Sequence, residues 1–279
     1  MSFYWKNFFF VVLFLSLTGC SQTQTTKPEA EPLASESLQT EQTPSKPLPA
    51  EHSHSKPATI KQLKLDHTET SDDDLERIVA ENPSLVELTL TGTKITDNGI
   101  IYLPKLNKLK KIRVSKTSIS NTTAEHLAKI STLEDIDVSQ TNFGDTGLAA
   151  LKSLPNLKRL NLYTTKITDN GLEVLKDFAS AKTIIWLNID QCPLTDAVIV
   201  KLIPLEHLEW LHLGRTKLTD TGLDDLAQLM TLKEVSITNT NVSQKGVDKL
   251  RNTLPNCKIN ENVEKSGDHE KDEGQDATP

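Results

Sequence analysis

The sequence is short of the residue types that enzymes and metal proteins gather at their sites. Among 279 residues there are three cysteines and two methionines, and aromatic residues make up 5%. The chain contains no Cys-x-x-Cys pair, no His-Glu-x-x-His motif and no glycine-rich phosphate loop. The one acid–base grouping, His212 near Asp190 and Asp137, has no nucleophile in a recognisable motif beside it. We therefore expect a protein without cofactor, metal centre or catalytic activity.

A surplus of positive charge is also lacking. The formal net charge is −7, from 31 basic and 38 acidic residues. Most of the excess acid lies towards the two ends of the chain, and between residues 58 and 260 acids and bases almost balance. A nearly neutral domain without a basic stripe is poorly suited to neutralising phosphates. Nucleic acid is therefore not an expected partner.

Long apolar runs are absent except at the start of the chain. Lys6 is followed by the apolar stretch Phe8 to Leu17, which is short for a membrane span of about 20 residues and typical of a secretory signal peptide. The sequence Leu17-Thr18-Gly19-Cys20 resembles the lipobox of bacterial lipoproteins. The resemblance implies that residues 1–19 are removed and that Cys20 is lipidated. An uncleaved anchor helix, or an ordinary signal peptide with a chance cysteine, are the alternatives.

The lipoprotein resemblance also implies a location in the bacterial cell envelope. A lipidated cysteine carries at least two acyl chains, which suffice for stable anchoring. In Gram-negative lipoproteins an aspartate after this cysteine favours the inner membrane, so Ser21 favours the outer membrane. Residues 20–59 are rich in Thr, Ser, Gln, Glu and Pro without apolar periodicity, which predicts a disordered tether. The acidic residues 261–279 predict a disordered tail.

A 24-residue period fills residues 60–260. Its copies begin at Ile60, Leu85, Leu109, Leu133, Leu157, Ile184, Leu208 and Leu232, and the copy from Leu157 has extra residues between 178 and 183. The consensus LxxLxLxxTxITDxGLxxLxxL resembles the leucine-rich repeat family, in its ribonuclease-inhibitor-like and F-box-associated subtype. The resemblance implies an α/β solenoid, a horseshoe of about eight strand–helix repeats with a parallel concave sheet.

The residue pattern within each copy supports the same fold. Leu88 and Leu90 alternate with polar residues, which predicts a short strand, and Leu103 and Leu106 have helical spacing. Threonine–aspartate pairs precede the helical stretches and predict helix N-caps at Thr96, Thr168, Thr195 and Thr219. One unit alone buries too little apolar surface, so the coils must stack into one core.

A threonine recurs at one position, and the cysteines need a separate account. The position holds Thr68, Thr93, Thr117, Thr141, Thr165, Cys192, Thr216 and Thr240. We expect these hydroxyls to satisfy backbone groups where the chain leaves each strand.

Cys192 and Cys257 lie about three coils apart, too far for a disulfide at roughly 4.8 Å per coil. Both are predicted to be small buried hydrophobic residues.

Strand side chains that point away from the core should form columns along the concave face. The first column is Gln62, Glu87, Lys111, Asp135, Arg159, Trp186, Trp210 and Glu234. The second is Lys64, Thr89, Arg113, Asp137, Asn161, Asn188, His212 and Ser236, and the third is Asp66, Thr91, Ser115, Ser139, Tyr163, Asp190, Gly214 and Thr238. The alternating signs from Glu87 to Arg159 predict a surface ion-pair ladder of small net stability.

The C-terminal half of these columns is the candidate binding site. Trp186 and Trp210 should stack side by side, and aromatic and arginine residues dominate binding hot spots. The predicted contact surface for a protein partner is Arg159, Tyr163, Trp186, Asn188, Asp190, Trp210, His212 and Arg215. Flat aromatic faces beside Asn161 and Asn188 also suit a carbohydrate or cell-wall polysaccharide. A third interpretation is that the tryptophans merely cover each other and the concave floor.

Overall fold

Strand, turn and helix alternate along the chain with the period that the sequence predicts. The computed structural model describes residues 60–262. Several predictions concern residues outside this range. They are the signal peptide, the lipidation of Cys20, the membrane location inferred from Ser21, the tether, and the tail beyond residue 262. Within the described residues, one sheet contains nine parallel strands, each hydrogen-bonded to the next in chain order.

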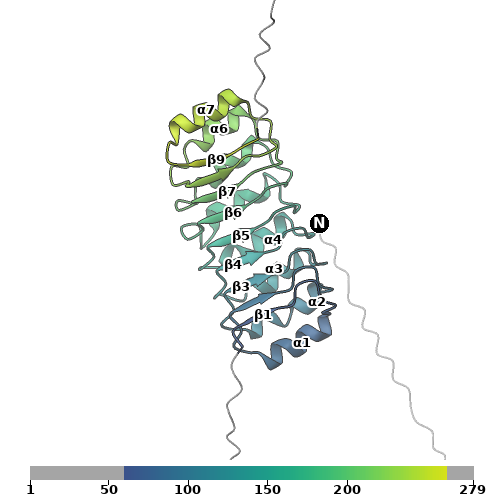
Figure 1. Cartoon of the computed structure of the whole chain (residues 1–279). Coiled ribbons are helices and arrows are strands. Elements are labelled where there is room, and N and C mark those ends of the chain that lie inside the picture. The colour runs from purple at the N-terminus through teal and green to yellow at the C-terminus, as the bar shows by residue number, and fades with distance from the viewer. Residues whose placement is uncertain (1–59, 263–279) are drawn as a thin grey trace, which may run out of the picture. The chain divides into compact units, whose positions relative to one another are not determined.

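The strands are three residues long and recur once per coil. They are β1 (Gln62–Lys64), β2 (Glu87–Thr89), β3 (Lys111–Arg113), β4 (Asp135–Asp137), β5 (Arg159–Asn161), β6 (Trp186–Asn188), β7 (Trp210–His212), β8 (Glu234–Ser236) and β9 (Lys258–Asn260). Figure 1 shows them stacked in a single layer, with the helices gathered on one side of the sheet. The opposite surface, which carries the outward strand side chains, is called the strand face below.

The helical side is built of short helices. The α-helices are α1 (Asp72–Glu81), α2 (Asp97–Ile100), α3 (Thr122–Leu127), α4 (Asp145–Ala150), α5 (Ile199–Leu202), α6 (Asp220–Leu226) and α7 (Gln244–Thr253). The 3₁₀ helices are η1 (Leu103–Lys105), η2 (Leu151–Ser153), η3 (Gly171–Asp177) and η4 (Asp196–Val198). None of these helices in residues 60–262 has the length and apolar character needed to cross a bilayer.

One continuous core lies between the sheet and the helices. The central residue of each strand from β2 to β8 faces the helices and is buried, as at Leu88 and Leu160. The extra residues of the fifth coil form a packed loop, in which Phe178 and Ser180 are also buried. The longer coil is therefore accommodated before β6, and the strand register continues through it.

The repeated threonines close the turn at the end of each strand, as predicted. Each hydroxyl donates to the carbonyl three residues earlier, at 2.6 to 2.8 Å, as Thr93 does to Leu90. Cys192 takes the place of one threonine, and its Sγ lies 3.2 Å from the Leu162 carbonyl of the preceding coil. It is buried as expected, whereas Cys257 is half-buried, and both are free thiols.

The helix N-caps follow the prediction in three of four coils. Thr96, Thr195 and Thr219 each accept a hydrogen bond from the N–H two residues later. Thr168 does not, because η3 begins only at Gly171 and no side chain caps it. The cap prediction was wrong in that coil because its helical segment starts too far along the chain for the Thr168 hydroxyl to reach.

Aspartates near the start of the helical segments join successive coils, a role that was not predicted from the sequence. Asp145 Oδ1 accepts the Thr168 N–H at 2.8 Å, and its Oδ2 accepts the Thr168 hydroxyl at 2.7 Å. The same double contact links Asp72 to Thr96, Asp97 to Ser120, Asp169 to Thr195, Asp196 to Thr219 and Asp220 to Ser243. We call this series the aspartate ladder.

A glycine makes room for each of several ladder carboxylates. A Cβ on Gly171 would overlap Asp145 Oδ1, and Gly99, Gly222 and Gly246 meet their ladder aspartates in the same way. Gly171 is thus required for close approach between coils. The recurring Thr-Asp-x-Gly sequence was the available signal for this contact.

The ninth strand was not predicted, because its copy of the repeat ends after the strand. β9 pairs with β8, and Val235 is opposite Ile259. Its sequence signal was Leu254-Pro255-Asn256, which repeats the Leu-Pro-Asn that leads into β5, but Cys257 follows where the earlier copy has leucine. The first two residues of the predicted tail belong to the end of the solenoid, because Glu261 pairs with Arg251 and Asn262 exchanges hydrogen bonds with Asn239.

We predict that Gly171→Ala lowers the free energy of unfolding by about 1–3 kcal/mol, because the new methyl group overlaps the Asp145 carboxylate. Asp145→Ala also destabilises, because it removes both bonds to Thr168. In the double variant the methyl group meets no carboxylate, so the combined loss should be smaller than the sum of the single losses. Denaturant unfolding of all four proteins measures this coupling. Strictly additive losses would show that the glycine serves another purpose.

We predict that Thr164→Asn raises the free energy of unfolding by on the order of 1 kcal/mol. Thr164 has φ +53°, a left-handed conformation that a β-branched side chain disfavours, and its buried hydroxyl has no hydrogen-bond partner among the described residues. Asn239 adopts the same conformation in a later coil, with φ +55°. The matched control is Gln140→Asn, at an unbranched residue with φ +55°. Equal effects at both positions in thermal unfolding would contradict the argument.

Candidate functional site: the aromatic and arginine patch of the strand face

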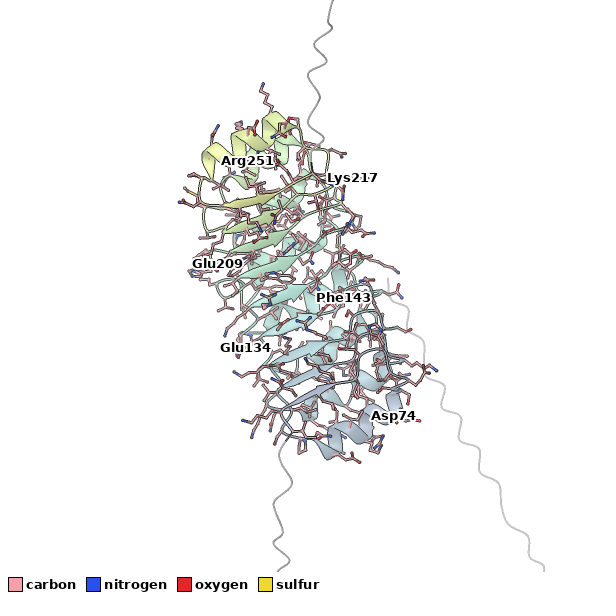
Figure 2. The ribbon with its side chains drawn as sticks, viewed as in Figure 1. Asp74, Glu134, Phe143, Glu209, Lys217 and Arg251 are labelled. Carbon is pink, nitrogen blue, oxygen red and sulfur yellow. The ribbon has the colours of Figure 1, made fainter. Side chains whose placement is uncertain are left out.

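The strand register confirms the first and second predicted columns. Arg159, Trp186 and Trp210 are consecutive partners on β5, β6 and β7, and Asn188 pairs with His212. The edge where the chain enters the strands carries both signs of charge, because Lys110 and Lys158 pair with Glu134 and Lys233 pairs with Glu209. Figure 2 shows Glu134 and Glu209 along the edge where the chain enters the strands, and Lys217 near the opposite edge. Sequence periodicity thus placed the candidate residues on neighbouring strands.

The Trp186 ring contacts an arginine and a histidine. The Arg159 guanidinium carbon lies 4.3 Å from the Trp186 ring centre. The His212 ring centre is 5.4 Å from that of Trp186, with the two planes tilted by 53°. Trp210 has the Lys233 ammonium 5.4 Å from its ring centre. The expected stacking of Trp186 on Trp210 was wrong: within the described chain, the aromatic partner of Trp186 is His212.

Arg215 is held in an arrangement similar to that of Arg159. Its guanidinium carbon lies 5.7 Å from the Tyr163 ring centre, and its Nε lies 3.2 Å from Asp190 Oδ1. Arg159 Nε lies 3.5 Å from Asp135 Oδ2. In both cases Nε faces a carboxylate beneath it and the guanidinium carbon lies over an aromatic ring. Both arginines were predicted from the sequence, and the alternating column paired Arg159 with Asp135, but the contact of Arg215 with Asp190 was not predicted.

The asparagines of the second column bind the backbone of their own turns. Asn161 Oδ1 accepts the Tyr163 N–H at 3.2 Å, and Asn188 Oδ1 accepts the Asp190 N–H at 3.0 Å. These oxygens satisfy backbone donors where the strands end. Each side chain keeps its NH₂ group as a donor towards the strand face.

Burial shifts the pKa values of two patch residues, Asp190 and His212. Burial raises the pKa of the Asp190 carboxyl, against the opposing effects of Arg215 and His212. Burial also lowers the pKa of His212, against the effects of Asp190 and Glu234. Asp190 Oδ1 is buried without a hydrogen-bond partner among the described residues, and Arg215 Nε lies 3.2 Å from it. Arg215 therefore compensates this carboxylate mainly through charge.

The predicted ion-pair ladder is a cluster centred on one carboxylate. Asp135 lies 3.8 Å from the Lys111 ammonium and 3.5 Å from Arg159, as the alternating column suggested. Arg113, from the second column, adds a contact to Asp135 at 4.0 Å and one to Asp137 at 3.9 Å. Burial raises the pKa of Asp135, and the three cations oppose that shift. The column pattern alone could not reveal this diagonal contact.

Grooves on the helical side contain none of the patch residues. One is lined by residues of α4 and η3, including Asp145, Ala149 and Val174. Another lies between α6 and α7 and is lined by Asp224 and Lys249 among others. The candidate patch is therefore a surface with fixed side chains, which suits an extended partner better than an enclosed small molecule.

We predict that lowering the pH from about 7.5 to about 5.5 reduces the free energy of unfolding more in the protein than in its His212→Gln variant. The folded pKa of His212 lies below its ordinary value of 6.5, so the folded state binds the proton less tightly than the unfolded chain. As the pH falls through that ordinary value, the unfolded state takes up the proton first and the free energy of unfolding decreases. Denaturant unfolding at both pH values checks this, and an equal loss in both proteins would refute it.

Comparisons with known proteins identify the repeat. A family model described as "Leucine Rich repeat" matches residues 81–103, 129–152 and 153–176. The structure is similar to that of an internalin C2 from Listeria monocytogenes, with a TM-score of 0.55 and 23% sequence identity. The similarity covers 73% of this chain and 81% of the internalin chain. No curated protein matches the sequence. The solved structure supports the fold alone, and together with the matched segments it shows an α/β solenoid of leucine-rich repeats.

Proposed function

Because the chain is built of leucine-rich repeats, we propose that it is a non-catalytic binding module that holds a protein partner on its strand face. The contact surface is the predicted patch from Arg159 to Arg215. One observation carries the proposal: two of the chain's three tryptophans occupy neighbouring strands, on the sheet surface that no helix of residues 60–262 covers, beside arginines that are already held in place.

The energetics of binding favour such a surface. Tryptophan, tyrosine and arginine contribute most to interface hot spots, and the patch contains all three types. Arg159 and Arg215 are positioned by aromatic rings and carboxylates before a partner arrives. Side chains that are ordered in advance lose less conformational entropy on binding. The stacked repeats provide the extended surface that a protein partner needs.

Carbohydrate binding remains the second candidate, and the ring contacts weigh against it. A sugar stacks on a flat aromatic face that is free. The Arg159 guanidinium lies over Trp186, and the Lys233 ammonium lies over Trp210. Each ring thus already has a cation over one face, which leaves less aromatic surface for a pyranose. A protein partner can use the cations as well as the ring edges.

The proposal places this module at the bacterial cell envelope. Its support is the sequence from Lys6 to Cys20, which resembles a lipoprotein signal peptide with its lipobox. A lipidated Cys20 would anchor the chain, with the outer membrane favoured by Ser21. Residues 21–59 would then separate the repeat domain from the membrane.

We predict that Trp186→Ala/Trp210→Ala abolishes capture of the partner in a crosslinking pull-down from intact cells. Both rings are half-buried on the strand face, so their removal should cost less stability than Leu160→Ala, which opens a core cavity and costs about 2–5 kcal/mol. Thermal unfolding of each variant separates loss of binding from loss of fold. Cys20→Ala should remove the protein from the membrane fraction.

The same experiment distinguishes the alternatives. A partner band that persists with a folded tryptophan double variant would exclude the patch as the contact surface. Retention of the parent protein on isolated cell-wall or surface polysaccharide, with no protein band, would favour the carbohydrate alternative. A membrane fraction unchanged by Cys20→Ala would exclude the lipid anchor and leave the binding proposal intact.

A further inference from the structure

The side chains of the patch point to the chemistry of its partner. We propose that the partner presents an acidic peptide segment, whose carboxylates bind Arg159 and Arg215 while its apolar side chains pack beside the tryptophans. This inference rests on the proposed function and deepens it. It follows from how the two arginines are held, from the layering of charge on the strand face, and from the hydrogen-bonding groups that remain for a partner.

Among residues 60–262, the ion pairs of Arg159 and Arg215 use Nε, which leaves the terminal amino groups of both side chains for a partner. In each, Nε faces a buried or half-buried carboxylate, at 3.5 Å for Arg159 and 3.2 Å for Arg215. The guanidinium carbons lie over the rings of Trp186 and Tyr163, which fixes their position. The terminal amino groups form a planar fork that matches the two oxygens of a carboxylate. Two such forks form a pair of anchors for carboxylates.

From β3 to the turn after β7, charge on the strand face is arranged in two layers. The cationic side chains are 29–45% exposed, and these are Lys111, Arg113, Arg159 and Arg215. The acidic side chains among them are 9–17% exposed, and these are Asp135, Asp137 and Asp190. A partner therefore meets the cations first. Glu234 is 31% exposed, but Asn260 and Lys258 already contact its carboxylate at 2.7 and 3.3 Å.

The neutral polar groups of the patch add donors. Asn161 and Asn188 use their side-chain oxygens to accept backbone N–H groups, so their NH₂ groups remain for a partner. Guanidinium and indole groups also donate and do not accept. A surface that offers mainly donors selects a partner rich in acceptors, and carboxylates are the strongest acceptors that a peptide carries.

A peptide fits this surface better than an acidic polysaccharide. Trp186 and Trp210 lie between Arg159 and Lys233, so a pair of apolar groups has a cation on each side. Matching both requires carboxylates and apolar side chains on the same ligand. Peptides carry both kinds of group, whereas an acidic polysaccharide carries carboxylates on a hydroxylated backbone. We therefore commit to an acidic peptide that also contains apolar residues.

The test uses the whole 279-residue chain and a synthetic peptide that alternates glutamate with leucine. A second peptide has glutamine in place of every glutamate. Tryptophan fluorescence and calorimetry measure binding. We expect the glutamate peptide to bind and the glutamine peptide to bind about tenfold more weakly or worse, because charge-assisted bonds are lost. Added salt should weaken the binding of the glutamate peptide.

Conservative variants separate a shaped site from general attraction. Arg159→Lys/Arg215→Lys keeps the net charge but removes both planar forks, and should weaken binding of the glutamate peptide about tenfold. The matched control is Arg77→Lys on α1, where the arginine is exposed and paired with Asp74 and Glu81. It should leave the affinity unchanged. Thermal unfolding of each variant confirms that the fold persists.

Several outcomes would overturn the inference. Equal binding of the two peptides, or an unchanged affinity in the lysine double variant, would exclude carboxylate recognition by the arginine forks. Polygalacturonate that binds while the glutamate peptide does not would assign the surface to an acidic polysaccharide.

Residues 263–279 hold six acids and two lysines. If removing them strengthens peptide binding, and the lysine double variant shows no such gain, the chain's own acidic segment competes for the arginines, which supports the inference.

Failure of this inference is distinguishable from failure of the proposed function. In the pull-down, a partner lost with Trp186→Ala/Trp210→Ala but retained with Arg159→Lys/Arg215→Lys would refute the acidic-peptide chemistry and leave the docking surface in place. A partner retained by both double variants would refute the docking surface itself. Loss in both supports the two proposals together.

Discussion

The solenoid depends on polar side chains that satisfy the backbone where each coil leaves the sheet. A buried N–H or carbonyl without a partner is costly, and these turns repeat once per coil. The threonine hydroxyl bonds within its own turn, as Thr93 does, and the ladder aspartate bonds to the following coil, as Asp145 does to Thr168. Apolar burial makes the coils stack, but it is not directional. The hydrogen bonds fix one stacking register, and that register sets the columns of the strand face.

The period of the sequence was sufficient to predict the fold because every coil solves the same physical problem with the same residue types. Equivalent positions therefore carry equivalent side chains, and the columns could be written down from spacing alone. β9 escaped prediction because its copy lacks a helical half and has Cys257 before the strand. The cap at Thr168 was wrong because the start of a short 3₁₀ helix depends on packing within one coil. The aspartate ladder was missed because a contact between coils leaves only a local Thr-Asp-x-Gly pattern in the sequence.

For the candidate site, the sequence predicted which residues are neighbours but could not predict how their side chains meet. Trp186 and Trp210 are neighbours as expected, yet Trp186 contacts His212 and Arg159. Side-chain rotamers depend on all neighbours at once, and here the half-buried Asp135 draws Arg159 across the tryptophan ring. A repeating pattern lists candidates column by column, whereas this arrangement joins residues from different columns. Only the three-dimensional structure shows that both arginines are held in the same way.

The carboxylates beside Arg159 and Arg215 explain why each arginine is held in place while most of its N–H donors remain for a partner. Burial raises the pKa of Asp135 and of Asp190, which shows that the surroundings disfavour their charged forms and that a nearby cation is needed to offset this. A lysine can supply that charge, but a guanidinium has five N–H donors, of which the inward Nε is one. The remaining four belong to the outward fork. The same ion pair that stabilises the floor of the strand face therefore presents a second, unused set of donors to whatever binds there.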